Sequence, residues 1–262
     1  MTDQVLYTLD ARGVATITLN RPDKHNAFNE ETIDALTAAF HRAASDPIVR
    51  VVILSAAGKS FSAGADVNWM QKMAGYNEAQ NRHDAMQLAT MLNTLYTLPK
   101  PTIARVQGAA FGGAVGLIAC CDMAIASKLS KFCLSEVKLG LIPATIGPYV
   151  IEAMGKRVAL RYFQTAEVFT ARRARRLGLL SEAVNQDQLD DTIEQLIGHL
   201  LKNGPEAVSE AKQLIHKVAG KPIDAAMLTT TSEWIARKRV SEEGQEGLNA
   251  FLGKRKPAWF KE

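Results

Sequence analysis

Hydrophobic and polar positions change their spacing along the first hundred residues, which predicts strands that alternate with helices. Alternating runs at 4–9 and 13–19 predict a β-hairpin. Apolar residues then recur every three or four positions over about 30–46, and Asn29 stands where a helix N-cap is expected. The short apolar run 50–54 lies between polar segments and predicts a buried parallel strand.

The same rhythm continues through the middle of the chain. A long helical pattern covers 79–97 and is followed by a strand pattern at 102–106. A helix is expected over 113–120, and two further strands at 123–126 and 131–134. This repetition of strand and helix predicts a parallel sheet with right-handed crossovers.

After about residue 145 the pattern becomes almost wholly helical. One strand-like stretch at 179–184 interrupts it, and glycine–proline breaks at 204–205 and 220–222 separate helices. This part lacks a sheet of its own, so we expect it to fold back on the core or to mediate assembly. The predicted helices cover 145–154, 156–165, 171–177, 187–202, 205–218, 222–238 and 241–252.

Composition narrows the class of protein. Hydrophobic residues make up 47% of the 262 positions, which is enough for a sizeable core, and a net charge of +4 is too weak to predict nucleic-acid binding. The three cysteines show no CxxC or other metal-binding spacing, so no metal site is expected. Because no apolar run approaches membrane-spanning length and the start is unlike a signal peptide, we expect a cytoplasmic protein that does not bind membranes.

Two turns of small residues and one downstream carboxylate carry the candidate chemistry. The turns at 61–66 and 108–113 each follow a β-like run and lead into a helix-like one, so their backbone N–H groups lie at helix starts. Two such N–H groups aimed at one point form an oxyanion hole. A carboxylate beside it, which we assign to Glu136, can move protons at carbon next to an enolate. The pattern therefore predicts an enzyme that acts on a polarised carbonyl.

These motifs, taken together, give the chain a resemblance to the crotonase superfamily, the enoyl-CoA hydratases and isomerases. The resemblance implies an α/β fold, a crotonase-like spiral of stacked ββα units over 1–200, with a helical C-terminal trimerisation region over 201–262. It also implies a homotrimer or a homohexamer. Single glycine motifs are weak signals, whereas the order and spacing of all the segments are specific. The matching segments are 19–27, 61–66, 100–104, 108–113, 121–122, 140–143 and 247–256.

The same resemblance implies an acyl-CoA substrate and no separate cofactor, since coenzyme A is part of the substrate. In similar proteins the N–H groups that match Ala65 and Gly113 hold the thioester oxygen, and the residue that matches Glu136 is catalytic. The residues that match Phe251 and Lys254 reach the nucleotide portion of coenzyme A bound to a neighbouring subunit. The other positions implied to line the substrate and coenzyme A path are Lys24, Ala27, Ala63, Gly64, Asp66, Val67, Gly112 and Gly116.

One departure from the family pattern leaves the reaction open. Hydratases of this family carry two glutamates, and here Gly116 stands at the position of the first. Glu136 alone can activate water and then protonate the α carbon, or it can shuttle a proton between the α and γ carbons as an isomerase does. A catalytically silent member that binds acyl-CoA or RNA is a third reading, although Glu136 is retained.

Local similarity favours hydration of a branched or carboxylated substrate. Residues 63–70 and 112–122 resemble bacterial hydratases of 3-methylglutaconyl-CoA and of the related carboxygeranoyl-CoA. The loop 143–148 departs from the glycine-rich form usual in the family, so a different acyl pocket is expected.

Overall fold

Two β-sheets form the framework of the protein, and the computed structural model describes residues 3–260 of the chain. The larger sheet has six strands in the order β1-β2-β3-β5-β7-β10. The first two strands form the expected antiparallel hairpin, and the others run parallel. Its strands are β1 (Val5–Leu9), β2 (Val14–Leu19), β3 (Val51–Ala56), β5 (Thr102–Val106), β7 (Met123–Ser127) and β10 (Glu182–Val184).

The smaller sheet has four short strands in the order β4-β6-β8-β9. The first three run parallel, and the last pairs antiparallel with β8. Its strands are β4 (Ser62–Ala63), β6 (Ala109–Phe111), β8 (Lys131–Cys133) and β9 (Phe169–Thr170).

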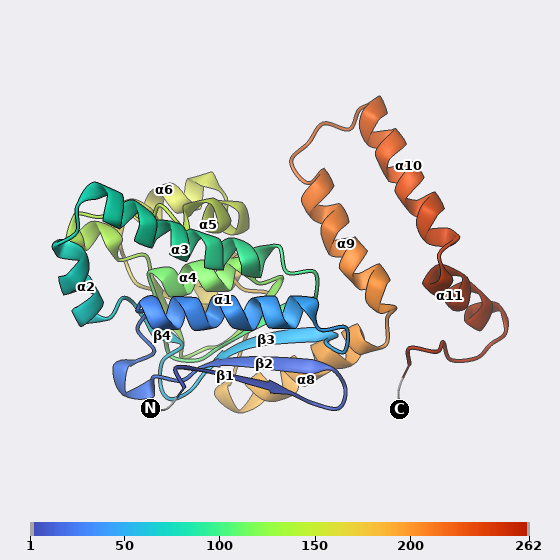
Figure 1. Ribbon diagram of the computed structural model, residues 1–262, viewed down its shortest axis with the longest axis horizontal. Helices are drawn as coiled ribbons and strands as arrows, with labels where there is room; N and C mark the ends of the chain where they lie inside the picture. The colour runs from blue at the N-terminus through green and yellow to red at the C-terminus, as the bar shows by residue number, and fades with distance from the viewer. Residues whose placement is uncertain (1–2, 261–262) are drawn as a thin grey trace.

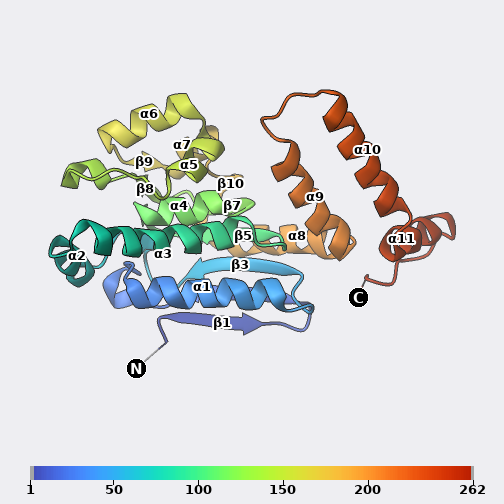
Figure 2. The same cartoon turned by 45° about the horizontal axis from the view of Figure 1, so that its top comes forward.

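Helices cover both sheets. In Figures 1 and 2, α1 and α3 lie side by side along the larger sheet, and α4 lies behind them. The helices of this part are α1 (Glu30–Ser45), α2 (Val67–Ala74), α3 (Glu78–Tyr96), α4 (Gly113–Cys120), α5 (Gly147–Met154), α6 (Lys156–Thr165), α7 (Ala171–Arg176) and α8 (Leu189–Leu201). Three single 3₁₀ turns accompany them: η1 (Pro22–Lys24), η2 (Glu136–Leu139) and η3 (Gln186–Gln188).

Strand β3 shows how the core is divided. All six of its residues are buried, as expected for a central parallel strand. Because side chains alternate between faces, Val52 and Leu54 join the core cluster shared with α1 and α3, whereas Val51 and Ile53 pack in the cluster of α8. The sheet is thus covered on both faces.

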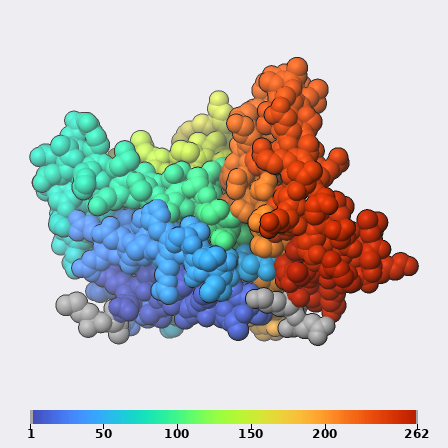
Figure 3. Space-filling view, turned by 45° about the vertical axis from the view of Figure 1, so that its right-hand side comes forward, coloured from blue at the N-terminus to red at the C-terminus, as the bar shows by residue number. Residues whose placement is uncertain are grey.

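The last three helices, which we call the C-terminal arm, extend away from the rest of the molecule (Figures 1 and 3). The arm consists of α9 (Pro205–Val218), α10 (Ala225–Arg239) and α11 (Glu242–Leu252). Within these helices only Ala250 is buried. Its exposed large apolar residues are Leu214, Ile215, Ile223, Leu228, Ile235, Val240, Leu248, Phe251 and Leu252. So much exposed apolar surface is typical of an interaction surface.

Polar contacts attach the arm to the body. Lys212 of α9 forms an ion pair with Asp122 at 3.0 Å. One turn further along α9, Nδ1 of His216 lies 3.1 Å from the hydroxyl of Tyr96 at the end of α3. The division into a core over 1–200 and an oligomerisation region over 201–262 stays a prediction.

Most expected elements are present within a few residues of the predicted bounds, among them the hairpin, α1 with its Asn29 cap and the late helices. The predicted parallel sheet is present as the larger sheet, whereas the strand expected at 131–134 lies in the smaller sheet, whose other strands were not predicted. A strand of two or three residues is too short to show a period. No helix in 3–260 combines the length and apolarity that crossing a bilayer requires.

Candidate active site

Three parallel strands bring the predicted site segments to one edge of the smaller sheet. Ser62 pairs with Ala110 and Ala63 with Phe111, so β4 and β6 run side by side. On the other side of β6, Phe111 pairs with Cys133 of β8. The two glycine turns and Glu136 follow the ends of these strands. In α/β proteins the carboxyl ends of parallel strands are the usual place for a ligand.

The strand register brings the two predicted turns side by side. The last pair of β4 and β6 is Ala63 with Phe111, neighbouring strands lie about 4.8 Å apart, and Ala65 and Gly113 each follow two residues beyond this pair. Phe28 pairs with Ala65 through bonds to Gly64 and Asp66, of 2.9 and 2.8 Å. This parallel bridge turns the N–H of Ala65 away from Phe28.

The Phe28 ring also touches the second donor. A Cβ at Gly113 would lie only 2.8 Å from Cε2 of Phe28, so the ring packs against this glycine. Gly113 begins α4, where an N–H has no partner within the helix. Within 3–260 neither Ala65 nor Gly113 donates its N–H to a backbone carbonyl outside the regular elements. Both groups are therefore available to a ligand.

Two glycines shape this edge. Gly64 and Gly112 have φ angles of +103° and +57°, which side chains disfavour. A Cβ at Gly64 would meet no atom within 4 Å, so the turn borders open space. A Cβ at Gly112 would lie 3.3 Å from Oε1 of Glu136. The absence of this side chain leaves room for the carboxylate beside the second donor.

Glu136 has the environment of a proton-transfer group. It begins η2, and its Oε2 is buried without a hydrogen-bond partner among the described residues. Burial raises the pKa of its carboxyl above the ordinary value, and a hydrogen bond from its own backbone N–H offsets this only in part. A half-buried acid with one buried, unpaired oxygen and a raised pKa is a candidate general base or acid in such a place.

The loop that carries Lys24 and Ala27 is attached to the segment between β3 and β4. Asn26 donates its side-chain N–H groups to the carbonyls of Ala57 and Ser60 at 2.8 and 2.9 Å. Lys24 is exposed and Ala27 is buried. The N–H of Ala63 bonds to the carbonyl of His25 at 3.0 Å, so the loop lies against the first glycine turn, and the role of Lys24 and Ala27 in binding coenzyme A stays a prediction.

A buried ion pair connects this loop to the oxyanion turn. Arg21 donates to Asp66 at 2.8 Å and to the carbonyl of Ala27 at 2.7 Å. Asp66 also accepts from the N–H of Asn68 at 2.9 Å and is the N-cap of α2. Burial raises the pKa of Asp66, but the bonds from Arg21 and Asn68 outweigh it and bring the pKa below its ordinary value. Asp66 is therefore a structural anion next to Ala65.

The remaining predicted residues lie in different surroundings. Gly116 faces a fully occupied space, since a Cβ there would lie 2.2 Å from Cγ2 of Ile146. Ala63 is half-buried in β4, and Val67 is exposed at the start of α2. Phe251 and Lys254, at and beyond the end of α11, lie across the molecule from α2 in Figures 1 and 2. Within a single chain, Phe251 and Lys254 therefore do not lie at the carboxyl ends of β4, β6 and β8.

Three residues of this region were not predicted: Phe28, Arg21 and Ile146. Arg21 lies in the matching segment 19–27, and Phe28 follows this segment directly. A loop residue shows no periodicity that reveals its partner in the fold. Ile146 lies in the loop 143–148, and the departure of this loop from the glycine-rich form of the family was the only sequence feature that pointed to it.

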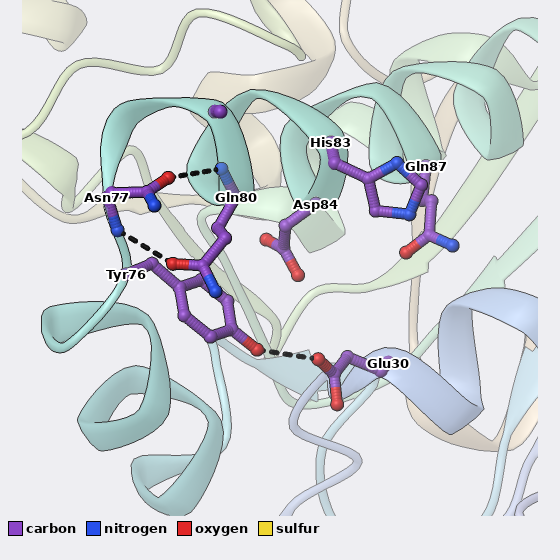
Figure 4. Close-up of a pocket in the computed structure, with 8 residues that line it drawn as sticks. Glu30, Tyr76, Asn77, Gln80, His83, Asp84 and Gln87 are labelled. Carbon is purple, nitrogen blue, oxygen red and sulfur yellow. Dashed lines mark hydrogen bonds between the residues drawn. The ribbon is translucent and has the colours of Figure 1, made fainter.

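A hollow of about 420 Å³ lies elsewhere, between the starts of α1 and α3 (Figure 4). Buried Asp84 points into it and accepts a hydrogen bond of 3.1 Å from Trp69. Ala65, Gly113 and Glu136 do not line this hollow, so it is separate from the strand-end site. Residues 3–260 contain no cluster of three or more His, Cys, Asp or Glu side chains suited to a metal ion.

Comparison with known proteins matches this architecture to one family. The family model for enoyl-CoA hydratase/isomerase matches residues 10–262. An enoyl-CoA hydratase structure from Shewanella pealeana is 50% identical with a TM-score of 0.95, over 98% of this chain and 96% of the other. The short-chain-enoyl-CoA hydratase of Clostridium acetobutylicum is 34% identical over 95% of this chain and 94% of its own. The 2,3-dehydroadipyl-CoA hydratase of Escherichia coli is 30% identical over 93% and 94%. The chain therefore belongs to the enoyl-CoA hydratase/isomerase family and has the α/β crotonase fold.

Proposed function

We propose that the protein adds water across the 2,3 double bond of an enoyl-CoA. The observation that carries this proposal is the pairing of β4 with β6, because these strands lead into the two turns that hold Ala65 and Gly113, and Glu136 lies beside Gly112. Two donors and one acid are the minimum for adding water to a conjugated thioester. Relatives that carry hydratase names along the whole chain support the choice.

In the proposed reaction the two N–H groups form an oxyanion hole. They donate hydrogen bonds to the thioester oxygen and bind it more strongly as it becomes an enolate, which lowers the barrier selectively. In acyl transfer, one such donor contributes about 2.7–4 kcal/mol to the transition state. The site therefore stabilises charge without any metal ion in the proposed steps.

Glu136 moves the protons in this proposal. Its carboxylate takes one proton from water while the hydroxide oxygen forms a bond to the β carbon. The double-bond electrons pass to the thioester as an enolate. The protonated Glu136 then donates that same proton to the α carbon, and the carbonyl reforms. A carboxyl whose pKa is raised by burial is suited to acting as base and then as acid.

Isomerisation is the second candidate. The observation that favours it is Gly116, which leaves the site with one carboxylate at these strand ends. In that reaction Glu136 takes a proton from one carbon of the enoyl chain and returns it two carbons away, and no water is added. A silent acyl-CoA- or RNA-binding role is less well supported, because Glu136 keeps a buried, unpaired oxygen beside the donors.

For the substrate, we propose a branched or carboxylated enoyl-CoA such as 3-methylglutaconyl-CoA. Support comes from the local resemblance of residues 63–70 and 112–122 and from a relative named for a carboxylated enoyl-CoA, the Escherichia coli protein.

We also propose a homotrimer or homohexamer in the cytoplasm. The exposed apolar residues of the C-terminal arm support assembly, and Phe251 and Lys254 would then contact coenzyme A bound to a neighbouring subunit.

An assay in ¹⁸O-labelled water tests the reaction. The protein is given 3-methylglutaconyl-CoA, crotonyl-CoA and a 3-enoyl-CoA. Hydration predicts labelled oxygen at the β carbon, with the branched substrate preferred. Migration of the double bond without label would reject the hydratase proposal in favour of the isomerase.

A further inference from the structure

Gly116 and Ile146 fit together as a small and a large residue. A Cβ at Gly116 would lie 2.2 Å from Cγ2 and 2.7 Å from Cβ of Ile146. Real Cβ atoms do not approach this closely, so any side chain at 116 requires Ile146 to move. Leu92 of α3 is also near, with Cδ2 at 3.5 Å. The space beside Gly116 is thus filled by two apolar side chains.

Ile146 has little freedom to move away. Its side chain is almost fully buried, at 2% exposure. Its carbonyl accepts the N–H of Val150 at 3.1 Å, so the backbone is part of the first turn of α5. Because protein interiors are closely packed, a larger residue at 116 cannot be absorbed by a small shift.

This filled space adjoins the proposed active site. Gly116 follows Gly113, the first residue of α4, by three positions, about 4.5 Å along the helix axis, and residues three apart lie on the same face of a helix. Gly113 is the second predicted donor, and the Glu136 carboxylate lies beside its neighbour Gly112. Ile146 therefore fills the space that a side chain at 116 would occupy, one turn of α4 from this donor.

We infer that Ile146 is a specificity-determining residue: it excludes a second carboxylate and so favours acyl groups that carry their own negative charge. This inference rests on the proposed function. A second carboxylate at 116, one turn of α4 from the donor Gly113, would repel a carboxylated acyl group, since like charges in a desolvated site repel strongly. With Ile146 in place, the space beside Gly116 is filled by apolar side chains, and the negative charge of the site is confined to Glu136.

An exchange of the two residues tests the inference. The variants are Gly116→Glu, Ile146→Gly and the double variant with both changes. Each is compared with the wild type by thermal melting and by kcat/KM for hydration of crotonyl-CoA, which is neutral in its acyl part, and 3-methylglutaconyl-CoA, which is anionic. Ile193→Val, in the α8 cluster of the core, serves as the control for a small change in packing.

Gly116→Glu alone is expected to melt well below the wild type, and the added Ile146→Gly is expected to restore part of the loss by removing the clash. In the double variant, the ratio of kcat/KM for crotonyl-CoA over 3-methylglutaconyl-CoA should rise by about 10-fold or more. Ile193→Val should leave the ratio unchanged. These results support the inference.

Two results overturn it: a Gly116→Glu protein that melts like the wild type, or a folded double variant whose substrate ratio is unchanged. A wild-type protein that hydrates neither thioester instead overturns the proposed function itself. The two failures are distinguishable, because the first two results are read against an active wild type.

Discussion

Replacing Arg21 by methionine tests whether the ion pair with Asp66 holds the oxyanion turn. The two side chains are only 17% and 9% exposed, and they lie 2.8 Å apart. Removing one partner of a buried pair leaves the other charge uncompensated, which costs about 3–5 kcal/mol. Since Arg21 keeps some contact with solvent, we expect the lower end, about 3 kcal/mol of unfolding free energy.

This loss has a size that melting experiments resolve. For a chain of this length, about 1 kcal/mol changes Tm by roughly 2–4 °C. The Arg21→Met protein should therefore melt about 6–12 °C below the wild type. Methionine keeps most of the apolar stem, so the effect reports on the charge and its hydrogen bonds.

The same variant should lose activity. Asp66 is adjacent to Ala65, and it caps α2 through Asn68. When Arg21 no longer holds Asp66, the N–H of Ala65 loses its fixed direction. A misplacement of about 1 Å at such a donor costs about 100-fold in rate. We expect kcat to fall by about 10- to 100-fold, with a smaller change in KM.

A matched control is available on α3. Arg82 pairs with Glu78 at 2.8 Å, but the side chains are 74% and 89% exposed. Arg82→Met should cost no more than about 0.5 kcal/mol. If Arg21→Met melted and turned over substrate like Arg82→Met, the reasoning about the buried pair would be refuted.

Four further predictions concern other parts of the structure. Glu136→Gln should lower kcat by about 10²–10⁴-fold while acyl-CoA binding persists in a titration. In the wild type, kcat/KM should fall as the pH drops through the raised pKa of Glu136, because the base must be ionised. This fall should occur at a pH above the ordinary pKa of a glutamate side chain. A fall of kcat/KM centred at or below that ordinary pKa would contradict the prediction. Gly108→Ala should abolish the folded, soluble protein, because φ is +64° and the new Cβ would lie 1.8 Å from the carbonyl oxygen of Lys59; normal yield and circular dichroism would argue against that strain. Ile235→Asp, at a half-exposed position of α10, should lower the mass in light scattering if the arm builds the oligomer, and an unchanged mass would exclude this position from the interface.

Most strands of the larger sheet and most helices were predictable because each shows a clear local pattern. Strand β3 is a continuous apolar run, and α1 has both an apolar stripe and an Asn29 cap. The N-cap role of Asp66 was predictable from its place before a helix. These signals are local, so the sequence alone reveals them.

The arrangement of the site was only partly predictable. The two turns and Glu136 were recognised, but their approach depends on pairing between β4, β6 and β8, strands too short for any pattern. The contacts of Phe28 with Ala65 and Gly113, and of Arg21 with Asp66, join residues about 40 to 85 positions apart. Propensity and spacing report neighbours along the chain, not such tertiary partners.

The replacement of the first glutamate illustrates the same limit. The sequence shows a glycine at 116 and an unusual loop at 143–148 as two separate departures. Only the structure shows that they are one change, because the isoleucine of the loop fills the space beside the glycine. Steric compensation of this kind depends on packing between α4 and the start of α5.

A crystal structure with a bound 3-hydroxyacyl-CoA product tests the central claim most directly. The account predicts that the thioester oxygen lies about 2.7–3.1 Å from the backbone nitrogens of both Ala65 and Gly113. It also predicts the β-hydroxyl within about 2.6–3.2 Å of the Glu136 carboxylate. A thioester oxygen bound by neither nitrogen, or a hydroxyl that faces away from Glu136, would contradict it.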